Sequence, residues 1–163
     1  MHPNFLAVCR RDWLKQGLGW LSGLALGSDT WAAGEGLPSV ISLPQALEKA
    51  LAQGQPLLVM VSLEGCVYCK MARQSHLVPM FKQGQPMVQV DMRTAQPVVD
   101  FSGSPTTHDQ LTRAWKISVA PTLLFFGKGG REVAERMEGT YLPDFYGAYL
   151  DERLTKGRKE LRP

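Results

Sequence analysis

The chain has 163 residues, of which 44% are hydrophobic and 20% charged, and its formal net charge is +3. This length suits one domain with a sizeable core, and the composition is that of a soluble globular protein rather than a disordered one. The small net charge gives no electrostatic reason to expect nucleic acid as a partner.

Residues 1–32 have the pattern of a secretory signal peptide of the twin-arginine type. Arg10 and Arg11 open a basic region, a weakly apolar Gly-rich stretch follows, and small residues supply a cleavage site after Ala32. The apolar stretch is short and interrupted by Gly, which argues against a membrane span, and an uncleaved N-terminal anchor is the alternative. We therefore expect cleavage after Ala32 and export to the periplasm.

Cleavage would change the cysteine content of the chain. Cys9 would leave with the signal, and Cys66 and Cys69 would be the two cysteines of the mature protein. Three basic and two acidic residues would also leave, so that 15 basic and 13 acidic residues remain. The mature protein would be almost neutral, which again excludes nucleic acid as an expected partner.

The mature chain is predicted to contain a linker (33–41), one folded domain (42–158) and a short tail (159–163). Hydrophobic spacing and turn residues predict the order α-β-α-β-α-β-β-α without internal repeats. The predicted elements cover residues 42–53, 57–63, 66–83, 87–92, 107–115, 122–126, 131–137 and a last helix from 142 onward. The side of the last helix that we expect to be buried carries Phe145, Tyr146, Tyr149, Leu150 and Leu154.

Particular residues support these assignments. Ser42 and Thr107 are each followed three residues later by Gln, which is the pattern of a helix N-cap. The strand 57–63 is almost wholly apolar, which predicts burial on both faces. Pro79 is expected to kink the second helix or end it early. The polar, turn-rich residues 93–106 are expected to form a long loop.

The most informative motif is Cys-x-x-Cys, formed by Cys66 and Cys69 with Val67 and Tyr68 between them. It follows an apolar strand and stands at the predicted start of a helix. The positive end of a helix stabilises a thiolate on the first cysteine, and the second cysteine can displace a partner from a mixed disulfide. Because so short a loop stabilises a fold little, the pair is expected to be a redox couple.

A Cys-x-x-Cys pair also begins many zinc sites. The chain has only one such pair, and His76 and His108 are the histidines that could complete a metal site. Their spacing fits no established zinc pattern. We therefore expect no metal and no bound cofactor, with both histidines at exposed or capping positions.

The order of elements, the Cys-x-x-Cys motif after the first strand and Val119-Ala120-Pro121-Thr122 before the third strand together resemble the thioredoxin superfamily. The resemblance covers Ser39 to Lys156. It implies an α/β thioredoxin fold, in which a central mixed four-stranded sheet is flanked by helices. It also implies a cis peptide bond before Pro121, which would lie against the cysteines while the backbone of Ala120 pairs with an extended substrate.

The resemblance also implies roles for the residues of the motif. Cys66 would be the exposed nucleophile and Cys69 the buried cysteine that resolves the mixed disulfide. Val67 and Tyr68 would face the substrate together with the proline motif. Glu64 is the nearest candidate for proton transfer, and the alternative is that it is an ordinary surface residue.

Three positions depart from the family pattern. Thioredoxins carry a buried carboxylate six residues before the first cysteine and a lysine partner on the next strand, and these positions are Met60 and Met87 here. The usual Trp before the first cysteine is Gly65, which opens the site to a bulkier partner. The Val-Tyr dipeptide lacks the His of strongly oxidising Dsb-type proteins, and it resembles that of reducing periplasmic thioredoxin-like proteins, including those of sulfur-oxidation systems.

We therefore expect a periplasmic thiol–disulfide oxidoreductase that acts as a protein-disulfide reductase. Its partners would be protein disulfides and, as electron donor, a membrane thiol transporter, and the protein would be a monomer. Two alternatives remain open. One is a disulfide oxidase or isomerase with the same fold, and the other is a non-catalytic thiol or metal carrier.

Overall fold

A computed structural model describes residues 36–139 and 143–162 of the chain. These residues belong to one unit, Ala32–Pro163. The predicted signal peptide and the first residues of the predicted linker (33–35) lie outside the described residues. None of the described helices combines the length and the apolar content needed to cross a membrane.

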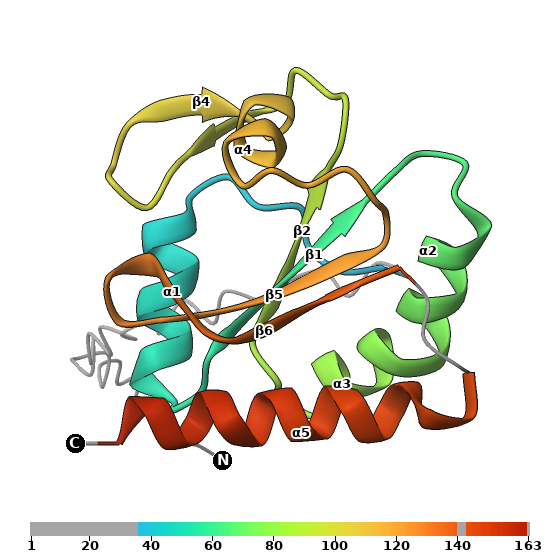
Figure 1. Ribbon diagram of the computed structural model, residues 1–163. Coiled ribbons are helices and arrows are strands. Elements are labelled where there is room, and N and C mark those ends of the chain that lie inside the picture. Colours follow the sequence, from blue (N-terminus) through green and yellow to red (C-terminus); the bar gives the residue numbers. More distant parts are fainter. Residues whose placement is uncertain (1–35, 140–142, 163) are drawn as a thin grey trace, which may run out of the picture. The chain divides into compact units, whose positions relative to one another are not determined.

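Four strands form a mixed sheet in the order β2-β1-β5-β6 (Figure 1). β1 (Leu57–Ser62) is parallel to β2 (Met87–Asp91) and antiparallel to β5 (Thr122–Gly127), and β5 is antiparallel to β6 (Arg131–Glu138). All residues of the two central strands, β1 and β5, are buried, as their apolar sequences predict. The sheet and its flanking helices confirm the predicted α/β fold.

Alternate residues of the central strands contribute to two cores, one on each face of the sheet. Leu58 and Met60 face the core that is closed by α2 (Val67–Ala72) and α5 (Pro143–Leu161). The other core contains the remaining apolar residues of β1 and is closed by α1 (Leu43–Ala52) and α4 (His108–Ala114). Figure 1 shows the helices divided between the two faces in this way. Burial of apolar surface on both faces is the main stabilising contribution to the fold.

The predicted N-caps of two helices are present. The Ser42 hydroxyl accepts from the backbone N–H of Gln45 at the start of α1. The Thr107 hydroxyl accepts from the backbone N–H of Gln110 at the start of α4. Each bond satisfies one N–H group that has no partner inside the helix.

The second helical segment covers almost the whole predicted range, residues 66–83, and changes its geometry midway. α2 passes into a π-helical turn, η1 (Arg73–Leu77), and continues as α3 (Val78–Lys82). Pro79 lies in the first turn of α3, and its lack of an N–H removes a bond to the preceding turn. The wider π-turn directly before Pro79 accommodates this loss. The irregularity expected at Pro79 is therefore a π-turn, and the helix ends at Lys82.

The prediction of one long loop over residues 93–106 is wrong. β3 (Pro97–Val99) and β4 (Pro105–Thr107) form a separate two-stranded antiparallel sheet. In the connection between them, the Asp100 carboxylate accepts hydrogen bonds from the Ser102 hydroxyl (2.6 Å) and from the backbone N–H of Ser104 (2.9 Å). These hydrogen bonds hold the pKa of the Asp100 carboxyl below its ordinary value. The bond from the Ser102 hydroxyl has the largest effect, and the bond from the Ser104 N–H has the next largest. Strands of three residues are too short to show alternation in the sequence.

The end of the predicted linker pairs with the edge of the sheet. Val40 donates its backbone N–H to the Gln89 carbonyl (3.0 Å), and Gln89 donates its N–H to the Pro38 carbonyl (2.8 Å). Residues 38–40 therefore cover the outer edge of β2, and Val40 is buried. An unprotected strand edge is prone to pairing with other chains, and this segment covers it.

The last helix buries only part of the predicted side. Tyr146, Leu150 and Leu154 are buried as expected, whereas Phe145 is 55% and Tyr149 39% exposed. The buried residues recur every fourth position, and a residue one position earlier is turned by about 100° towards solvent. The expectation that Phe145 and Tyr149 are buried is therefore wrong. α5 extends to Leu161, so the predicted tail begins inside the helix.

Candidate active site

The Cys-x-x-Cys motif stands where the central strand β1 turns into a helix. Gly65 lies in this connection with φ +73°, a left-handed conformation that favours glycine. Cys66 follows as the N-cap of α2, and its Sγ accepts a hydrogen bond from the backbone N–H of Cys69 (3.1 Å). The strand-to-helix turn thus places the first sulfur among the free N–H groups of a helix start, which favour negative charge.

The two cysteines form a disulfide and differ in exposure. The structure holds Cys66 and Cys69 as a disulfide, with their Cα atoms 5.2 Å apart. Cys69 is 1% exposed and belongs to the core, whereas Cys66 is half-buried at the edge of that core. An external thiol or disulfide therefore has access to Cys66 and not to Cys69.

The predicted proline lies beside the disulfide. The Ala120–Pro121 peptide bond is cis, and the Ala120 carbonyl oxygen is 3.8 Å from Cys66 Sγ. The Pro121 carbonyl accepts from the Gly139 N–H (2.8 Å), and the Thr122 hydroxyl donates to the Val119 carbonyl (2.7 Å). These bonds tie the segment before β5 to its surroundings and fix Ala120 next to the reactive sulfur.

The other residues expected at the site lie around its opening. Val67 is 70% and Tyr68 59% exposed at the start of α2. Large apolar side chains with this exposure are suited to contact with a partner. Glu64 is exposed and lines a pocket that also borders Cys66. Its assignment to proton transfer stays a prediction.

The positions that depart from the family pattern are packed in the core. Met60 and Met87 are both buried and belong to the same apolar cluster as Cys69. Their exposed fractions are 0% and 2%. Among the described residues that are buried, none is Asp, Glu, Lys or Arg.

Neither histidine lies with the cysteines. His76 stacks against Tyr146, with ring centroids 4.8 Å apart. His108 is buried rather than exposed: its Nδ1 accepts from the Asp91 N–H (3.0 Å), so its Nε2 donates to the Val40 carbonyl (2.9 Å). Within the described residues, no group of three His, Cys, Asp or Glu side chains is placed to hold a metal ion.

A pocket of about 600 Å³ opens next to Cys66, and the sequence did not indicate it. Its walls come from the end of β1, from the helical segment α2–η1 and from β2. It is lined by Ser62, Leu63, Glu64, Gly65, Cys66, Val67, Lys70, Arg73, Gln74, Gln89, Asp91 and Thr94. The spacing of these residues in the sequence does not indicate that they lie close together, because their proximity depends on the parallel pairing of β1 with β2.

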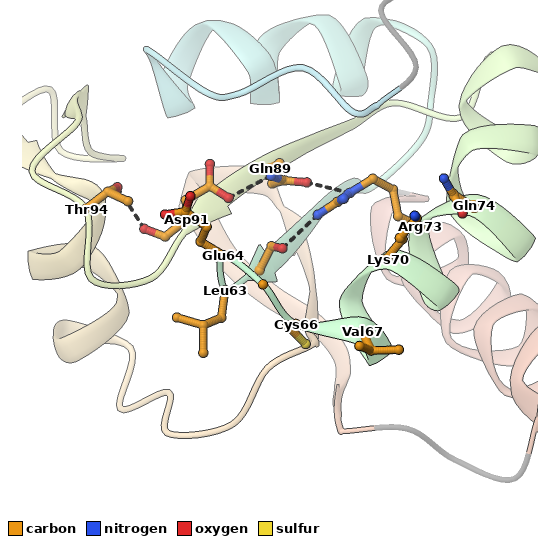
Figure 2. Close-up of a pocket in the computed structure, with 12 residues that line it drawn as sticks. Leu63, Glu64, Cys66, Val67, Lys70, Arg73, Gln74, Gln89, Asp91 and Thr94 are labelled. Atoms are coloured by element: carbon orange, nitrogen blue, oxygen red, sulfur yellow. Dashed lines mark hydrogen bonds between the residues drawn. The ribbon is translucent and has the colours of Figure 1, made fainter.

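Hydrogen bonds fix the inner wall of this pocket (Figure 2). Arg73 donates from Nε to the Gln89 side-chain oxygen (2.9 Å) and from Nη2 to the Ser62 hydroxyl (2.7 Å). Gln89 in turn donates from Nε2 to the Asp91 carboxylate (2.7 Å). Arg73 is the first residue of the π-turn, and such turns frequently occur at functional sites.

The mixed sheet, the half-buried Cys66 paired with the buried Cys69, and the proline segment beside them define a protein of the thiol–disulfide oxidoreductase class. A family model described as a thioredoxin-like domain matches residues 43–153. The chain therefore belongs to the thioredoxin-like family, which confirms the resemblance seen in the sequence. No match was found among curated proteins.

Solved structures with a similar fold include thioredoxins from several sources. A thioredoxin from Thermus thermophilus is 21% identical, with a TM-score of 0.49 over 73% of this chain and 85% of that one. The DsbH oxidoreductase is 20% identical, with a TM-score of 0.49 over 77% of this chain and 87% of that one. The periplasmic thioredoxin SoxS from Paracoccus pantotrophus is 19% identical, with a TM-score of 0.43 over 63% of this chain and 98% of that one.

Proposed function

We propose that this protein is a periplasmic protein-disulfide reductase that works through Cys66 and Cys69. The observation that carries the proposal is the unequal exposure of the two cysteines at a helix start. A substrate disulfide can reach Cys66, while Cys69 is held behind it, in position for the second step. This arrangement suits a two-step exchange in which the substrate is bound covalently only once.

The reaction begins with the reduced protein. The Cys66 thiolate attacks one sulfur of the substrate disulfide, which forms a mixed disulfide and releases the first substrate thiolate. Cys69 then loses its proton and attacks Cys66 Sγ, which releases the second substrate thiolate and leaves the Cys66–Cys69 disulfide. The two substrate sulfurs take up two electrons and two protons, and the two cysteines supply the electrons.

The segment at Ala120 is proposed to bind the polypeptide around the substrate disulfide. The pairing of β5 with β1 ends at Thr122, so Ala120 lies beyond the paired part of the strand. An extended substrate segment can pair there like an added strand, a few ångströms from Cys66. Val67 and Tyr68 would contact its side chains on the opposite side of the sulfur.

We propose that the protein is exported and receives its electrons from a membrane thiol transporter. The support is the twin-arginine pattern of residues 1–32, which predicts transport out of the cytoplasm. Soluble reductants are scarce in such compartments. Fusion of residues 1–35 to a periplasmic reporter tests the export. Replacement of Arg10 and Arg11 by lysine should abolish transport, and unchanged transport would contradict the twin-arginine route.

The test of the reductase activity is insulin reduction with a dithiol as electron donor. Wild-type protein should accelerate the precipitation of insulin chains, and C66S should give only the background rate. The variant C69A should accumulate mixed disulfides on Cys66, whereas C66A/C69A should accumulate none. A wild-type protein that does not exceed C66S, or a C69A variant without covalent partners, would favour a non-catalytic carrier.

The direction of the reaction in cells is a separate measurement. Acid quenching followed by thiol labelling reports the redox state of Cys66 and Cys69. A mostly reduced pair is expected, and its oxidation is expected when the membrane donor is deleted. A mostly oxidised pair in unperturbed cells would instead favour the disulfide oxidase.

A further inference from the structure

We infer that the pocket beside Cys66 binds a small disulfide that carries both carboxylate and ammonium groups, of the cystine class. The inference rests on the proposed function, because it names a second class of substrate for the same pair of cysteines. Protein substrates would approach along Ala120, whereas the small disulfide would enter from the side of β2. The two routes meet at Cys66.

The pocket is continuous with the reactive sulfur. Cys66 and Gly65 both line the pocket, and Gly65 has no side chain that could separate the pocket from the Cys66 sulfur. A Cβ added at Gly65 would have no atom within 4 Å, so the space beside it is open. The volume of about 600 Å³ is within the range of small-molecule sites, which is about 300–1,000 Å³.

Charges of both signs line the pocket on opposite sides. Figure 2 shows Lys70 and Arg73 on the helical side and Glu64 and Asp91 on the strand side. The cations can hold a carboxylate, and the acidic residues can hold an ammonium group. A ligand that carries both a carboxylate and an ammonium group can contact both sides of the pocket, whereas a ligand with one kind of charge can contact only one side.

The charged side chains of the inner wall are held in place before any ligand binds. Arg73 is fixed by Ser62 and Gln89, and one oxygen of Asp91 is fixed by Gln89. Binding to groups that are already oriented loses less conformational entropy. Glu64 and Lys70 are exposed at the mouth and can adjust to the ligand.

The chemistry is the same exchange with a smaller substrate. The Cys66 thiolate attacks one sulfur of cystine and releases one cysteine thiolate. The Cys69 thiolate then attacks Cys66 Sγ, releases the second cysteine and forms the Cys66–Cys69 disulfide. Two electrons pass from the protein to the small disulfide, and no other reactant is needed for one turnover.

The experiment uses pre-reduced full-length protein and four small disulfides that differ in their charged groups. Cystine carries both kinds, dithiodipropionate carries carboxylates, cystamine carries ammonium groups, and hydroxyethyl disulfide carries neither. Acid quenching, alkylation and mass spectrometry of the peptide with Cys66 and Cys69 give the rate of disulfide formation. Each rate is divided by the rate of the same disulfide with the uncharged thiol dithiothreitol, which corrects for differences in intrinsic reactivity.

Wild-type protein should oxidise about tenfold faster with cystine than with hydroxyethyl disulfide on this normalised scale, as expected for two charge-assisted contacts. Relative to hydroxyethyl disulfide, K70Q should lower the rates with cystine and dithiodipropionate by about fivefold. Asp91→Asn should lower those with cystine and cystamine by about fivefold. The matched control is K82Q, because Lys82 is exposed on α3 and does not line the pocket. It should leave every ratio as in the wild type.

The outcomes separate the two proposals. Equal normalised rates for all four disulfides, or equal effects of K70Q and K82Q, would overturn the pocket proposal while insulin reduction continues. Loss of insulin reduction in K70Q and Asp91→Asn, with unchanged ratios among the small disulfides, would assign the pocket to protein side chains instead. A wild-type protein that reduces neither insulin nor any small disulfide would overturn the proposed function itself.

Discussion

Cys69 is buried in an apolar environment, because its neighbours in the core are hydrophobic side chains. Met60 and Met87 belong to the same cluster, and none of the buried residues in the described part of the chain is Asp, Glu, Lys or Arg. An apolar setting disfavours a thiolate. In the proposed reaction, the proton of Cys69 must therefore leave towards the side of Cys66, where solvent and Glu64 are found.

A carboxylate placed behind Cys69 should destabilise the protein. M60D should lower the free energy of unfolding at pH 8 by about 3 kcal/mol or more, because a buried unpaired charge is costly. Burial raises the pKa of the new carboxyl, so this variant should lose stability as the pH rises above about 4. Urea denaturation at pH 5 and pH 8 measures the effect.

Two further variants control this prediction. M60L keeps the volume and should cost less than about 1.5 kcal/mol at either pH. M60D/M87K should regain part of the stability at pH 8 if the two side chains meet. An M60D protein as stable at pH 8 as at pH 5 would show that water reaches this position.

At the scale of secondary-structure elements, some strands could be predicted from the sequence and others could not. The strands β1 and β5 were predictable because long apolar runs are buried on both faces. The strands β3 and β4 were not, because each has three residues and Val98 is their one buried side chain. Hydrogen bonds to the Asp100 carboxylate hold the turn between them, and such bonds leave no periodic pattern in the sequence.

The candidate site also has parts that could be predicted from the sequence and parts that could not. The Cys-x-x-Cys motif and the proline segment could be predicted, since their residue types and spacing are local. The pocket could not, because Ser62, Arg73 and Gln89 come from three elements and meet only through the fold. The π-turn that begins at Arg73 also has no clear sign in the sequence except Pro79.

The turn at Asp100 should contribute a pH-dependent stability. Because hydrogen bonds lower the pKa of this carboxyl in the folded protein, its contribution is present above its unfolded value of about 4 and is lost as the pH falls below it. D100N should be less stable than the wild type at pH 6, and the difference should shrink by pH 2.5. Thermal unfolding at both pH values tests this, and a constant difference would contradict it.

The helix α5 should tolerate substitution on one side only. Leu150 is fully buried, so L150A should lower the free energy of unfolding by about 2–5 kcal/mol. F145A, on the same helix but at an exposed position, should cost less than about 1 kcal/mol. Chemical denaturation distinguishes the two, and similar losses would mean that Phe145 packs against other residues in solution.

At the scale of the whole molecule, one sheet joins two cores. Leu43 belongs to the core on the side of α1, and Leu150 to the core on the side of α5. Since the central strands contribute side chains to both, the two cores should unfold together in one transition.

The double variant L43A/L150A tests this coupling. Each substitution should cost about 2–5 kcal/mol, and the two costs should add within about 0.5 kcal/mol because the sites lie on opposite faces. Urea unfolding followed by far-UV circular dichroism gives the values. A transition with two steps would show that one core can open while the other stays intact.

The complete burial of β1 also bears on how such a protein can diverge in evolution. Every side chain from Leu57 to Ser62 is buried, and exposed side chains follow on both sides of Cys66, at Glu64, Val67 and Tyr68. Partner choice can therefore drift through changes at Glu64, Val67 and Tyr68, which touch neither core. A library randomised at these three positions should keep most of its members folded, whereas one randomised within β1 should lose most of them.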